Sequence, residues 1–243
     1  MDNNWLARTE LLLTEQKVAQ LKESNVLVVG LGGVGAYAAE MIARAGVGKM
    51  TIIDGDVANI TNLNRQLLAT HSGLGQPKAE LMAKRLRDIN PDIELTVINE
   101  FLRDERTLEV LQAQKYDYVV DAIDTLSPKL YLIKFTLDMG YPLISSMGAG
   151  GKIDPSKIQV AKISKTYNCM LAKAIRKRMK KMEIIKQFKT VFSSELANEE
   201  AVVHSEEEQN KKSMVGTISY MPAIFGCTLA SVVINDLIAD NLE

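Results

Sequence analysis

The sequence predicts an α/β fold with a mostly parallel sheet and flanking helices, and three observations lead to this prediction. Short apolar runs of strand length alternate with helical segments through the first 150 residues. A glycine-rich turn at 30–35 joins the first of these runs to a helix. Hydrophobic residues make up 47% of the 243-residue chain and charged residues 24%, so the chain can bury a substantial core.

The expected elements of the first half follow in a regular order. Leucine and valine side chains at helical spacing predict a first helix at about 9–21. The expected strands are 25–29, 49–53, 94–98, 116–123 and 142–146. Helices are expected between them, because Gly46 and Gly48 follow one helical pattern and Pro77 opens another.

Past residue 151 the alternation stops, and a C-terminal α+β portion is expected. We expect one strand at 157–163, a basic helix from about Leu171 and a second strand at 188–192. The segment 193–213 holds six glutamates and little apolar periodicity, so it predicts a mobile loop.

The last apolar segment, 213–235, carries no charged residue and is long enough to span a bilayer as a helix. Its glycine, proline, serine and threonine residues lower its hydropathy. We therefore expect a short buried strand, then a buried helix from about Pro222, and no membrane partner. The N-terminus lacks the order of a secretory signal, so we expect a cytoplasmic protein.

Charge and cysteine content limit the kinds of partner and cofactor. Lysine and arginine number 29 against 30 for aspartate and glutamate, so a net charge of -1 gives no global attraction to nucleic acid. Cys169 and Cys227 form no Cys-x-x-Cys pair, which argues against structural zinc and against a disulfide framework. We expect Cys227 in the core, and His71 and His204 at the surface.

The turn at 30–35 fits the pattern G-x-G-x-x-G between a predicted strand and a predicted helix. Its glycines are Gly30, Gly32, Gly33 and Gly35. They allow a tight turn and a close approach of helix N–H groups to phosphate oxygens, as in Rossmann-like folds. Asp54, at the end of the next predicted strand, can accept hydrogen bonds from ribose hydroxyls. Taken alone, the motif most often indicates a nicotinamide-dependent oxidoreductase.

Further polar residues favour a nucleoside triphosphate over a dinucleotide. Asn62 and Arg65 share a helix face, and Lys78 follows a proline at a helix start. Two additional cations suit a triphosphate that is cleaved, because its oxygens and the leaving pyrophosphate need neutralisation. Asp124 lies just beyond the fourth predicted strand and could hold Mg²⁺, whereas Asp121 is the less suitable ligand. Surface ion pairs are the alternative interpretation of these charges.

Together these residues resemble the ubiquitin-activating-enzyme-like adenylating superfamily, over residues 5–150. The matching segments are 30–35, 54–56, 62–66, 75–78 and 121–124. In that superfamily, ATP and a substrate carboxylate form an acyl adenylate. The resemblance implies an ATP site that comprises the four glycines, Asp54, Asp56, Asn62, Arg65, Gln66 and Lys78, with Mg²⁺ at Asp124. Asp54 would contact the ribose, and Asn62, Arg65 and Lys78 the phosphates.

The same resemblance implies a homodimer in which an N-terminal arginine reaches the partner's triphosphate. Arg8 matches that arginine by its position before the glycine loop, and an exposed residue at a helix start is the alternative interpretation. Arg8, Arg65, Lys78 and Asp124 are then the candidate catalytic residues. We expect one adenylation domain over 1–243, with a nucleotide-binding half at 1–150 and a substrate-binding and dimer half at 151–243.

Within the superfamily, the chain is similar to the tRNA threonylcarbamoyladenosine dehydratases. The similarity lies at 8–12, 120–125, 145–150 and 216–222. That family uses ATP to activate the carboxylate of N6-threonylcarbamoyladenosine in tRNA and closes it into a cyclic form with net loss of water. The attacking group belongs to the same side chain, so no protein nucleophile is required. A sulfur-relay protein is a further partner to consider.

A basic helix supports an RNA substrate independently of the resemblance. Its candidate tRNA-binding residues are Lys173, Arg176, Lys177, Arg178, Lys180 and Lys181. Such a density of positive charge can neutralise several phosphates. A solvated helix face is the alternative, and Cys169, just before the helix, could instead carry a thioester.

Three other functions stay open at this point. The nearest is an adenylyltransferase that acts on the C-terminal glycine of a sulfur-carrier or ubiquitin-like protein. Many such enzymes carry two Cys-x-x-Cys pairs, which this chain lacks. The others are a nicotinamide-dependent oxidoreductase and a non-catalytic scaffold.

Overall fold

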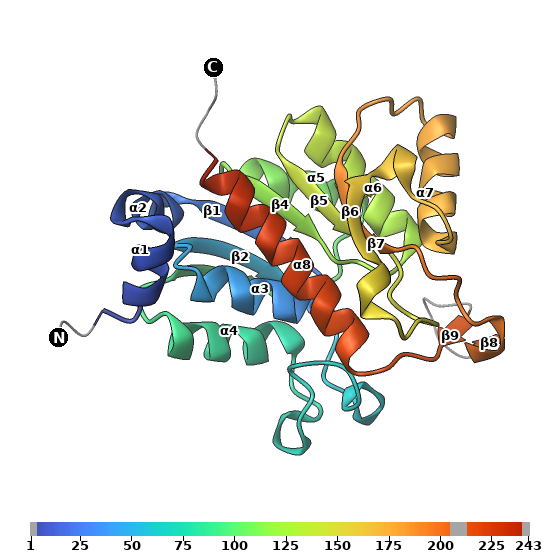
Figure 1. The fold of residues 1–243 in the computed structure, drawn as a ribbon, viewed down its shortest axis with the longest axis horizontal. Coiled ribbons are helices and arrows are strands. Elements are labelled where there is room, and N and C mark those ends of the chain that lie inside the picture. Colours follow the sequence, from blue (N-terminus) through green and yellow to red (C-terminus); the bar gives the residue numbers. More distant parts are fainter. Residues whose placement is uncertain (1–3, 205–212, 240–243) are drawn as a thin grey trace.

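A seven-stranded sheet forms the centre of the computed structural model, which describes residues 4–204 and 213–239 (Figure 1). The strand order is β3-β2-β1-β4-β5-β7-β6. The strands are β1 (Asn25–Val29), β2 (Lys49–Ile53), β3 (Glu94–Ile98), β4 (Tyr118–Asp121), β5 (Leu143–Ser146), β6 (Ile158–Lys162) and β7 (Lys189–Ser193). All neighbouring pairs are parallel except β6 and β7. The predicted α/β fold with a mostly parallel, Rossmann-like sheet is therefore confirmed.

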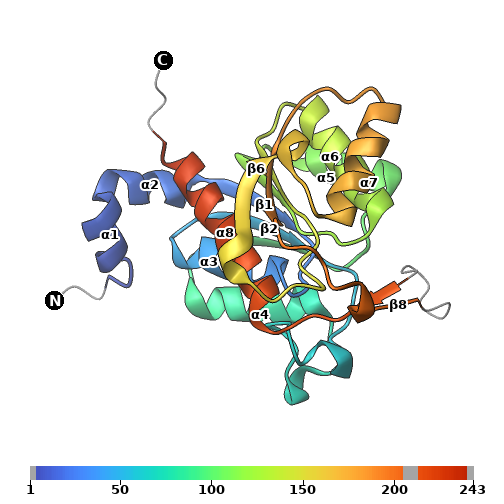
Figure 2. The ribbon, with the colours of Figure 1, turned by 45° about the vertical axis from the view of Figure 1, so that its right-hand side comes forward.

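Helices cover both faces of the sheet and enclose two apolar cores. One core lies under α3 (Gly35–Arg44), α4 (Lys78–Ile89) and α8 (Tyr220–Leu237). The other lies under α5 (Asp104–Ala113), α6 (Leu126–Asp138) and α7 (Met170–Lys181). In Figure 2 these two groups of helices lie on opposite sides of the strands. The inner strands are thus buried on both faces, as their continuous apolar runs require, whereas the edge strands β3 and β6 are partly exposed.

The N-terminal segment differs from the single helix expected at 9–21. It forms α1 (Ala7–Leu13) and α2 (Glu15–Glu23), which project from one end of the sheet (Figure 1). Thr14 separates them with a φ of 82°, and its side chain accepts a hydrogen bond from the Lys17 amide. Threonine is a favourable residue at such a helix start, so a new helix begins there. Val18 and Leu21 of α2 are buried, whereas α1 has no fully buried residue and contacts the core through the partly buried Leu13.

The C-terminal half contains the expected strand, basic helix and second strand, each within one or two residues. In the segment 193–213, Glu199–Ala201 form a 3-10 turn, and β8 (Val202–His204) pairs with β9 (Ser213–Val215). Residues 205–212 lie outside the described part of the chain, and the mobility of this segment stays a prediction. The strand before α8 is present, but Val215 is exposed rather than buried.

Helix α8 crosses one face of the sheet and packs on α3 (Figure 1). A Cβ at Gly226 would lie 2.4 Å from the Val34 carbonyl oxygen, so only glycine permits this approach. By length and composition, α8 is the single described helix that could cross a membrane, and its inner side chains are buried in the protein. The expectation that Cys227 lies in the core is wrong. Its side chain falls on the outer face, between the buried positions of Phe225 and Leu229.

One buried carboxylate joins α3 to α4, the two helices that begin at the glycine loop and at Lys78. Glu40 accepts hydrogen bonds from Arg44 Nε at 2.8 Å and from Arg85. Burial alone would raise the pKa of the Glu40 carboxyl, but the hydrogen bonds from Arg85 and Arg44 outweigh burial and hold the pKa below its ordinary value. This network therefore stabilises the relative position of the two helices in a pH-dependent way.

We expect Glu40→Gln to lower the free energy of unfolding by about 1–2 kcal/mol at pH 7, since the charge assistance of three hydrogen bonds from two half-exposed arginines is lost. The folded-state pKa is depressed, so the stabilisation is present above the ordinary value of 4.5 and is lost as the pH falls through the folded-state pKa. Denaturant titrations of both proteins at pH 7 and below pH 4.5 measure the difference. Glu80→Gln, at an exposed position of α4, is the control. A difference that persists undiminished in acid would contradict this assignment.

Candidate active site

The sequence-predicted nucleotide residues gather at one edge of the sheet. Parallel strands end at the same edge, and the segments that follow β1, β2, β4 and β5 meet there. These segments are the glycine loop, the turn at 54–56, the turn at 122–125 and the loop at 147–151. In open parallel sheets this edge is where ligands bind.

Close packing requires three of the four glycines of the loop. Gly30 has a φ of 90°, and a Cβ there would lie 2.9 Å from the Ala122 carbonyl oxygen. A Cβ at Gly35 would lie 1.7 Å from the Gly30 oxygen, which no side chain permits. At Gly33, a Cβ would lie 3.0 Å from Pro222. Gly32 is different, because its Cβ would meet only Gln66 Nε2 at 3.9 Å. That open position is where a ligand can approach the backbone.

The Asp54 carboxylate connects the glycine loop to the turn at 54–56. Its Oδ2 accepts a hydrogen bond from the Leu31 N–H at 2.6 Å, and its Oδ1 accepts from the Asp56 N–H at 2.8 Å. Burial raises the pKa of the Asp54 carboxyl, while the Lys78 ammonium and these amides act in the opposite direction. The amides fix the orientation of the carboxylate and leave it lone pairs for further donors.

Lys78 is the first residue of α4, and its side chain is only 5% exposed. Its Nζ donates to Asp56 Oδ2 at 3.0 Å, and its backbone N–H donates to the Asp56 carbonyl at 2.9 Å. Asp56 is the more exposed partner. The ammonium group has three donors, so it can bind an anion at this edge while it keeps its contact with Asp56.

The segment between β2 and α4 carries the other expected phosphate contacts. Asn62 ends a 3-10 turn and is buried, and its Oδ1 accepts from the Asn59 N–H at 3.2 Å. Arg65 donates from Nη1 to the Thr61 carbonyl at 2.7 Å, so its guanidinium lies along its own loop. The Gln66 Oε1 atom is buried without a hydrogen-bond partner among the described residues. Such an atom indicates that a donor is still to be supplied at this position.

The two aspartates at the end of β4 have different surroundings. Asp121 is fully buried and forms an ion pair with Lys129 of α6. Burial raises the pKa of the Asp121 carboxyl, and Lys129 and Ser145 act against this effect. Asp124 is exposed in the turn that follows. Within the described ranges, no three histidine, cysteine, aspartate or glutamate side chains cluster as a metal site. A cation at this edge would therefore need further oxygen ligands from a bound molecule or from water.

Arg8 is not brought to this edge within one chain. It is exposed on α1, whose neighbour Leu6 packs against Gly46 at the C-terminal end of α3. The glycine loop lies at the other end of α3, roughly 15 Å away by helix rise. Figure 2 likewise shows α1 well apart from the start of α3.

The basic helix α7 begins close to the nucleotide edge and runs away from it. Ala172, Ile175 and Met179 face the core, so the charged residues point outward. The exposed cations are Lys173, Lys177, Arg178, Lys180 and Lys181. Arg176 is partly buried and donates to Thr166 Oγ1, which gives it a structural contact. Cys169 is buried, with Sγ 3.9 Å from the Cβ position of Gly148.

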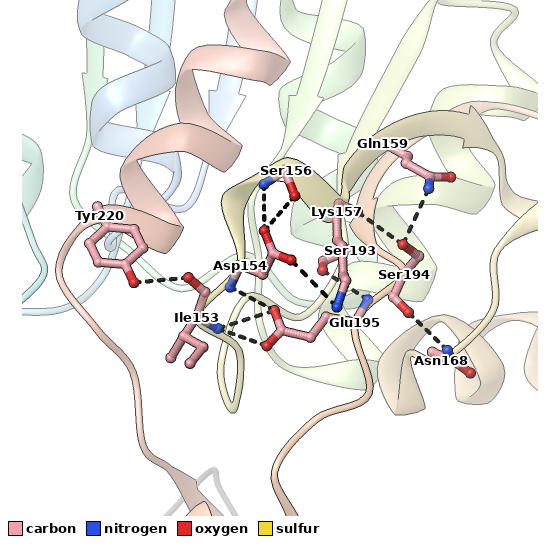
Figure 3. A network of polar contacts seen from close by, with 10 residues as sticks. All are labelled: Ile153, Asp154, Ser156, Lys157, Gln159, Asn168, Ser193, Ser194, Glu195 and Tyr220. Atoms are coloured by element: carbon pink, nitrogen blue, oxygen red, sulfur yellow. Dashed lines mark hydrogen bonds and ion pairs between the residues drawn. The ribbon is translucent and has the colours of Figure 1, made fainter.

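Figure 3 shows a polar network that joins the loop after β5 to the starts of α7 and α8. Glu195 accepts from the amides of Ile153 and Asp154, at 3.1 and 2.9 Å. Asn168 Nδ2 donates to the Ser194 carbonyl at 2.8 Å, and Tyr220 donates to the Ile153 carbonyl at 2.8 Å. The network fixes the position of α7 relative to the sheet edge.

Sequence reasoning missed two residues beside this edge. Phe101 lies against the turn at 54–56, with ring atoms 2.7 Å from the Cβ position of Gly55, and its side chain is 51% exposed. An aromatic residue shortly after a predicted strand was the available signal. Lys152 is buried, and its Nζ donates to the Ser193 carbonyl at 2.7 Å. Burial lowers the pKa of Lys152, and no local pattern distinguishes this lysine from an exposed one.

Comparison with known proteins gives results that agree with this geometry. Residues 6–242 match the model of the ThiF family. The chain is 40% identical over 241 residues to the tRNA threonylcarbamoyladenosine dehydratase of Bacillus subtilis, a match that covers 96% of this chain and 94% of that protein. It is 40% identical over 125 residues to the molybdopterin-synthase adenylyltransferase of Escherichia coli, which covers 51% and 49% of the two chains.

Solved structures give the same result for nearly the whole fold. The crystal structure of Escherichia coli tRNA N6-threonylcarbamoyladenosine dehydratase in complex with ATP superposes with a TM-score of 0.87 at 33% identity. That match covers 96% of this chain and 93% of the solved one. The resemblance found in the sequence is thereby confirmed. The chain belongs to the ThiF family, and within it to the group of proteins named tRNA threonylcarbamoyladenosine dehydratase.

Proposed function

We propose that this chain uses ATP to dehydrate and cyclise N6-threonylcarbamoyladenosine in tRNA. The carboxylate of the modified nucleoside attacks the α-phosphorus of ATP, which releases pyrophosphate and forms an acyl adenylate. The carbamoyl group of the same side chain then attacks the activated carbonyl and displaces AMP, which carries away one carboxylate oxygen. The observation that carries this proposal is near full-length similarity to dehydratases, joined to a sheet edge that assembles the expected nucleotide residues.

The residues of this edge would bind and orient ATP. The glycine loop and the start of α3 offer N–H groups to phosphate oxygens. Asp54, fixed by two backbone amides, would accept from the ribose. Lys78 and Arg65 would neutralise the phosphates, with Asn62 and Gln66 as hydrogen-bonding partners and Asp56 as the residue that orients Lys78. Such preorganised charges favour the transition state of phosphoryl and adenylyl transfer.

The exposed Asp124 carboxylate is a suitable magnesium ligand at this edge. Mg²⁺ at nucleotide sites takes one or two carboxylates and completes its shell with phosphate oxygens and water. A single hard oxygen donor beside the glycine loop fits that pattern. Bound there, the ion would neutralise phosphate charge as pyrophosphate leaves.

We further propose that 1–150 form the nucleotide-binding half and that 151–243 bind tRNA and contribute to a dimer. The exposed cations of α7 lie on a helix that starts beside the proposed site, so a bound tRNA would lie close to ATP. Since tRNA is the substrate, the protein would act in the cytoplasm.

The adenylation of a carrier protein is the second candidate. It is supported by 40% identity to a molybdopterin-synthase adenylyltransferase over 51% of this chain. The similarity to a sulfur-carrier adenylyltransferase also supports a sulfur-relay protein as a further partner. The exposed cations of α7 favour tRNA.

Incubation with ATP, Mg²⁺ and tRNA that carries threonylcarbamoyladenosine separates the two candidates. Nucleoside mass spectrometry should detect a product lighter by one water, in equal amount to the AMP released. If the tRNA stays unchanged while a carrier protein with a C-terminal glycine is adenylated, the second candidate replaces the first.

We expect Lys78→Ala and Arg65→Ala each to slow pyrophosphate release by about 10²- to 10³-fold, because each variant lacks a cation that would neutralise the leaving pyrophosphate. Single-turnover assays with tRNA and ATP measure this effect. Lys84→Ala, at an exposed position of α4, should be unaffected. Wild-type rates in a correctly folded Lys78 variant would remove this residue from the site.

The position of Arg8 supports a role in the partner's site within a homodimer. Arg8 cannot reach the glycine loop of its own chain, and two neighbouring leucines, Leu11 and Leu12, are 89% and 81% exposed. These side chains form an apolar surface that a second copy could cover.

Mixing equal amounts of the inactive variants Arg8→Ala and Lys78→Ala should restore up to about a quarter of the wild-type activity. Random exchange makes about half of the dimers mixed, and one of the two sites in each mixed dimer has both residues intact. Activity is measured after subunit exchange has been demonstrated with labelled chains. Exchange without any recovery would show that Arg8 does not act across the dimer.

Charge reversal of α7 should weaken tRNA binding and leave ATP binding unchanged. Replacement of Lys173, Lys177, Lys180 and Lys181 by Glu removes four cations from one helix face and should reduce the salt-dependence slope by about three to four, since roughly 0.9 counterions are released per phosphate. Filter binding over a salt series measures this slope. Reversal of Lys84 and Arg87 on α4 is the matched control. An unchanged slope would place the tRNA elsewhere.

A further inference from the structure

A fully buried ion pair lies directly behind the turn that carries Asp124. Lys129 Nζ of α6 is 2.9 Å from Asp121 Oδ2 at the end of β4, and both side chains are 0% exposed. Ser145 donates to the same carboxylate oxygen at 2.6 Å. The loss of hydration of two buried charges commonly exceeds the gain from their attraction, so stability alone does not explain such a pair.

The other hydrogen bonds of the pair bind the backbone N–H and the carbonyl oxygen of Ile123. Asp121 Oδ1 accepts from the Ile123 N–H at 3.1 Å. Lys129 Nζ donates to the Ile123 carbonyl oxygen at 2.8 Å. The N–H belongs to the peptide that joins Ala122 to Ile123, and the carbonyl belongs to the peptide that joins Ile123 to Asp124. The ion pair therefore fixes two consecutive peptide planes of the turn between β4 and α6.

Each of these planes belongs to a different part of the proposed site. Gly30 packs on the first plane, where a Cβ would lie 2.9 Å from the Ala122 oxygen and 3.2 Å from the Ile123 nitrogen. Gly35 also lies close, with its Cβ position 2.9 Å from Ala122 Cβ. The second plane ends at the backbone nitrogen of Asp124. The same ion pair thus holds both the peptide on which the glycine loop packs and the backbone of Asp124.

We propose that Lys129 and Asp121 are positioning residues that set the distance between the glycine loop and the Asp124 carboxylate. Phosphates bound by the loop and a Mg²⁺ ion bound by Asp124 would then meet in one geometry. This inference rests on the proposed function, because it requires Mg²⁺-ATP at this edge. Neither residue touches the nucleotide, and their effect passes through the backbone of Ile123. A shell of this kind, one layer behind a ligand, commonly sets metal affinity.

Two variants separate positioning from stability. Lys129→Met leaves a buried carboxylate without its partner and should lower Tm by roughly 10 °C. The double variant Asp121→Asn with Lys129→Met removes both charges and should recover most of that loss, since neutral pairs of similar volume replace buried ion pairs well. Lys134→Met is the matched control, because it removes an exposed ion pair with Asp138 from the same helix.

Calorimetric ATP binding at a series of Mg²⁺ concentrations is the decisive measurement, with each variant studied well below its own Tm. We expect the double variant to need about 10-fold more Mg²⁺ for half-maximal ATP binding, even where its Tm approaches that of the wild type. Lys134→Met should match the wild type in both measurements. A structural role alone predicts that the Mg²⁺ dependence recovers together with Tm. An unchanged Mg²⁺ dependence in any folded variant of the pair overturns the proposal.

This measurement does not depend on the reaction with tRNA. A wild-type protein that binds Mg²⁺-ATP but forms no cyclic nucleoside would contradict the proposed function and leave the positioning role intact. If the wild-type protein forms the cyclic nucleoside but the double variant has an unchanged Mg²⁺ dependence, the proposed function stands and the positioning role is contradicted.

Discussion

The close approach of Gly30 to the peptide between Ala122 and Ile123 is the contact on which the whole site depends. Strands β1 and β4 are paired with Val29 opposite Asp121, so both strands end at the same level of the sheet. Their turns must then share the space above the sheet, and a Cβ at Gly30 would not fit there. The same tight turn puts Gly35 against the Gly30 carbonyl, which allows α3 to begin at once. The glycine pattern is therefore a packing requirement before it is a ligand-binding one.

Apolar runs predicted β1 and β2 well, because burial on both faces leaves a clear sequence pattern. The half-exposed edge strand β3 also has the predicted bounds. The fourth run, at 116–123, is longer than β4 at both ends. Tyr116 is buried before the strand starts, and Ile123 lies in the turn held by Lys129. Apolarity reports burial rather than strand pairing, so a strand cannot be distinguished from the buried turns that flank it.

The residues that the sequence could not place are those whose surroundings come from distant segments. Lys129 and Lys152 carry the charge typical of surface residues, yet both are buried because carboxylate or carbonyl acceptors reach them from other strands. Asp54, Lys78 and Asp124 were easier to find, since Asp54 directly follows a strand, Lys78 opens a helix and Asp124 lies in the short turn after a strand. Local sequence thus identifies residues at element ends, whereas tertiary structure decides which polar residues form the layer behind them. The break at Thr14 has a local cause but was missed, because the spacing of Val18 and Leu21 also fits an unbroken helix.

The distribution of polar groups also bears on the type of chemistry proposed for this edge. A substrate that supplies its own attacking group needs orientation and charge neutralisation, and both come from fixed donors and cations rather than from a protein nucleophile. Cys169 is buried beneath the loop after β5, and Cys227 lies on the outer face of α8. Asp54 and Lys78, in contrast, have their orientations fixed by hydrogen bonds to neighbouring residues. A rigid, polar edge of this kind is suited to hold ATP and a carboxylate in line, while the reacting bonds belong to the substrates themselves.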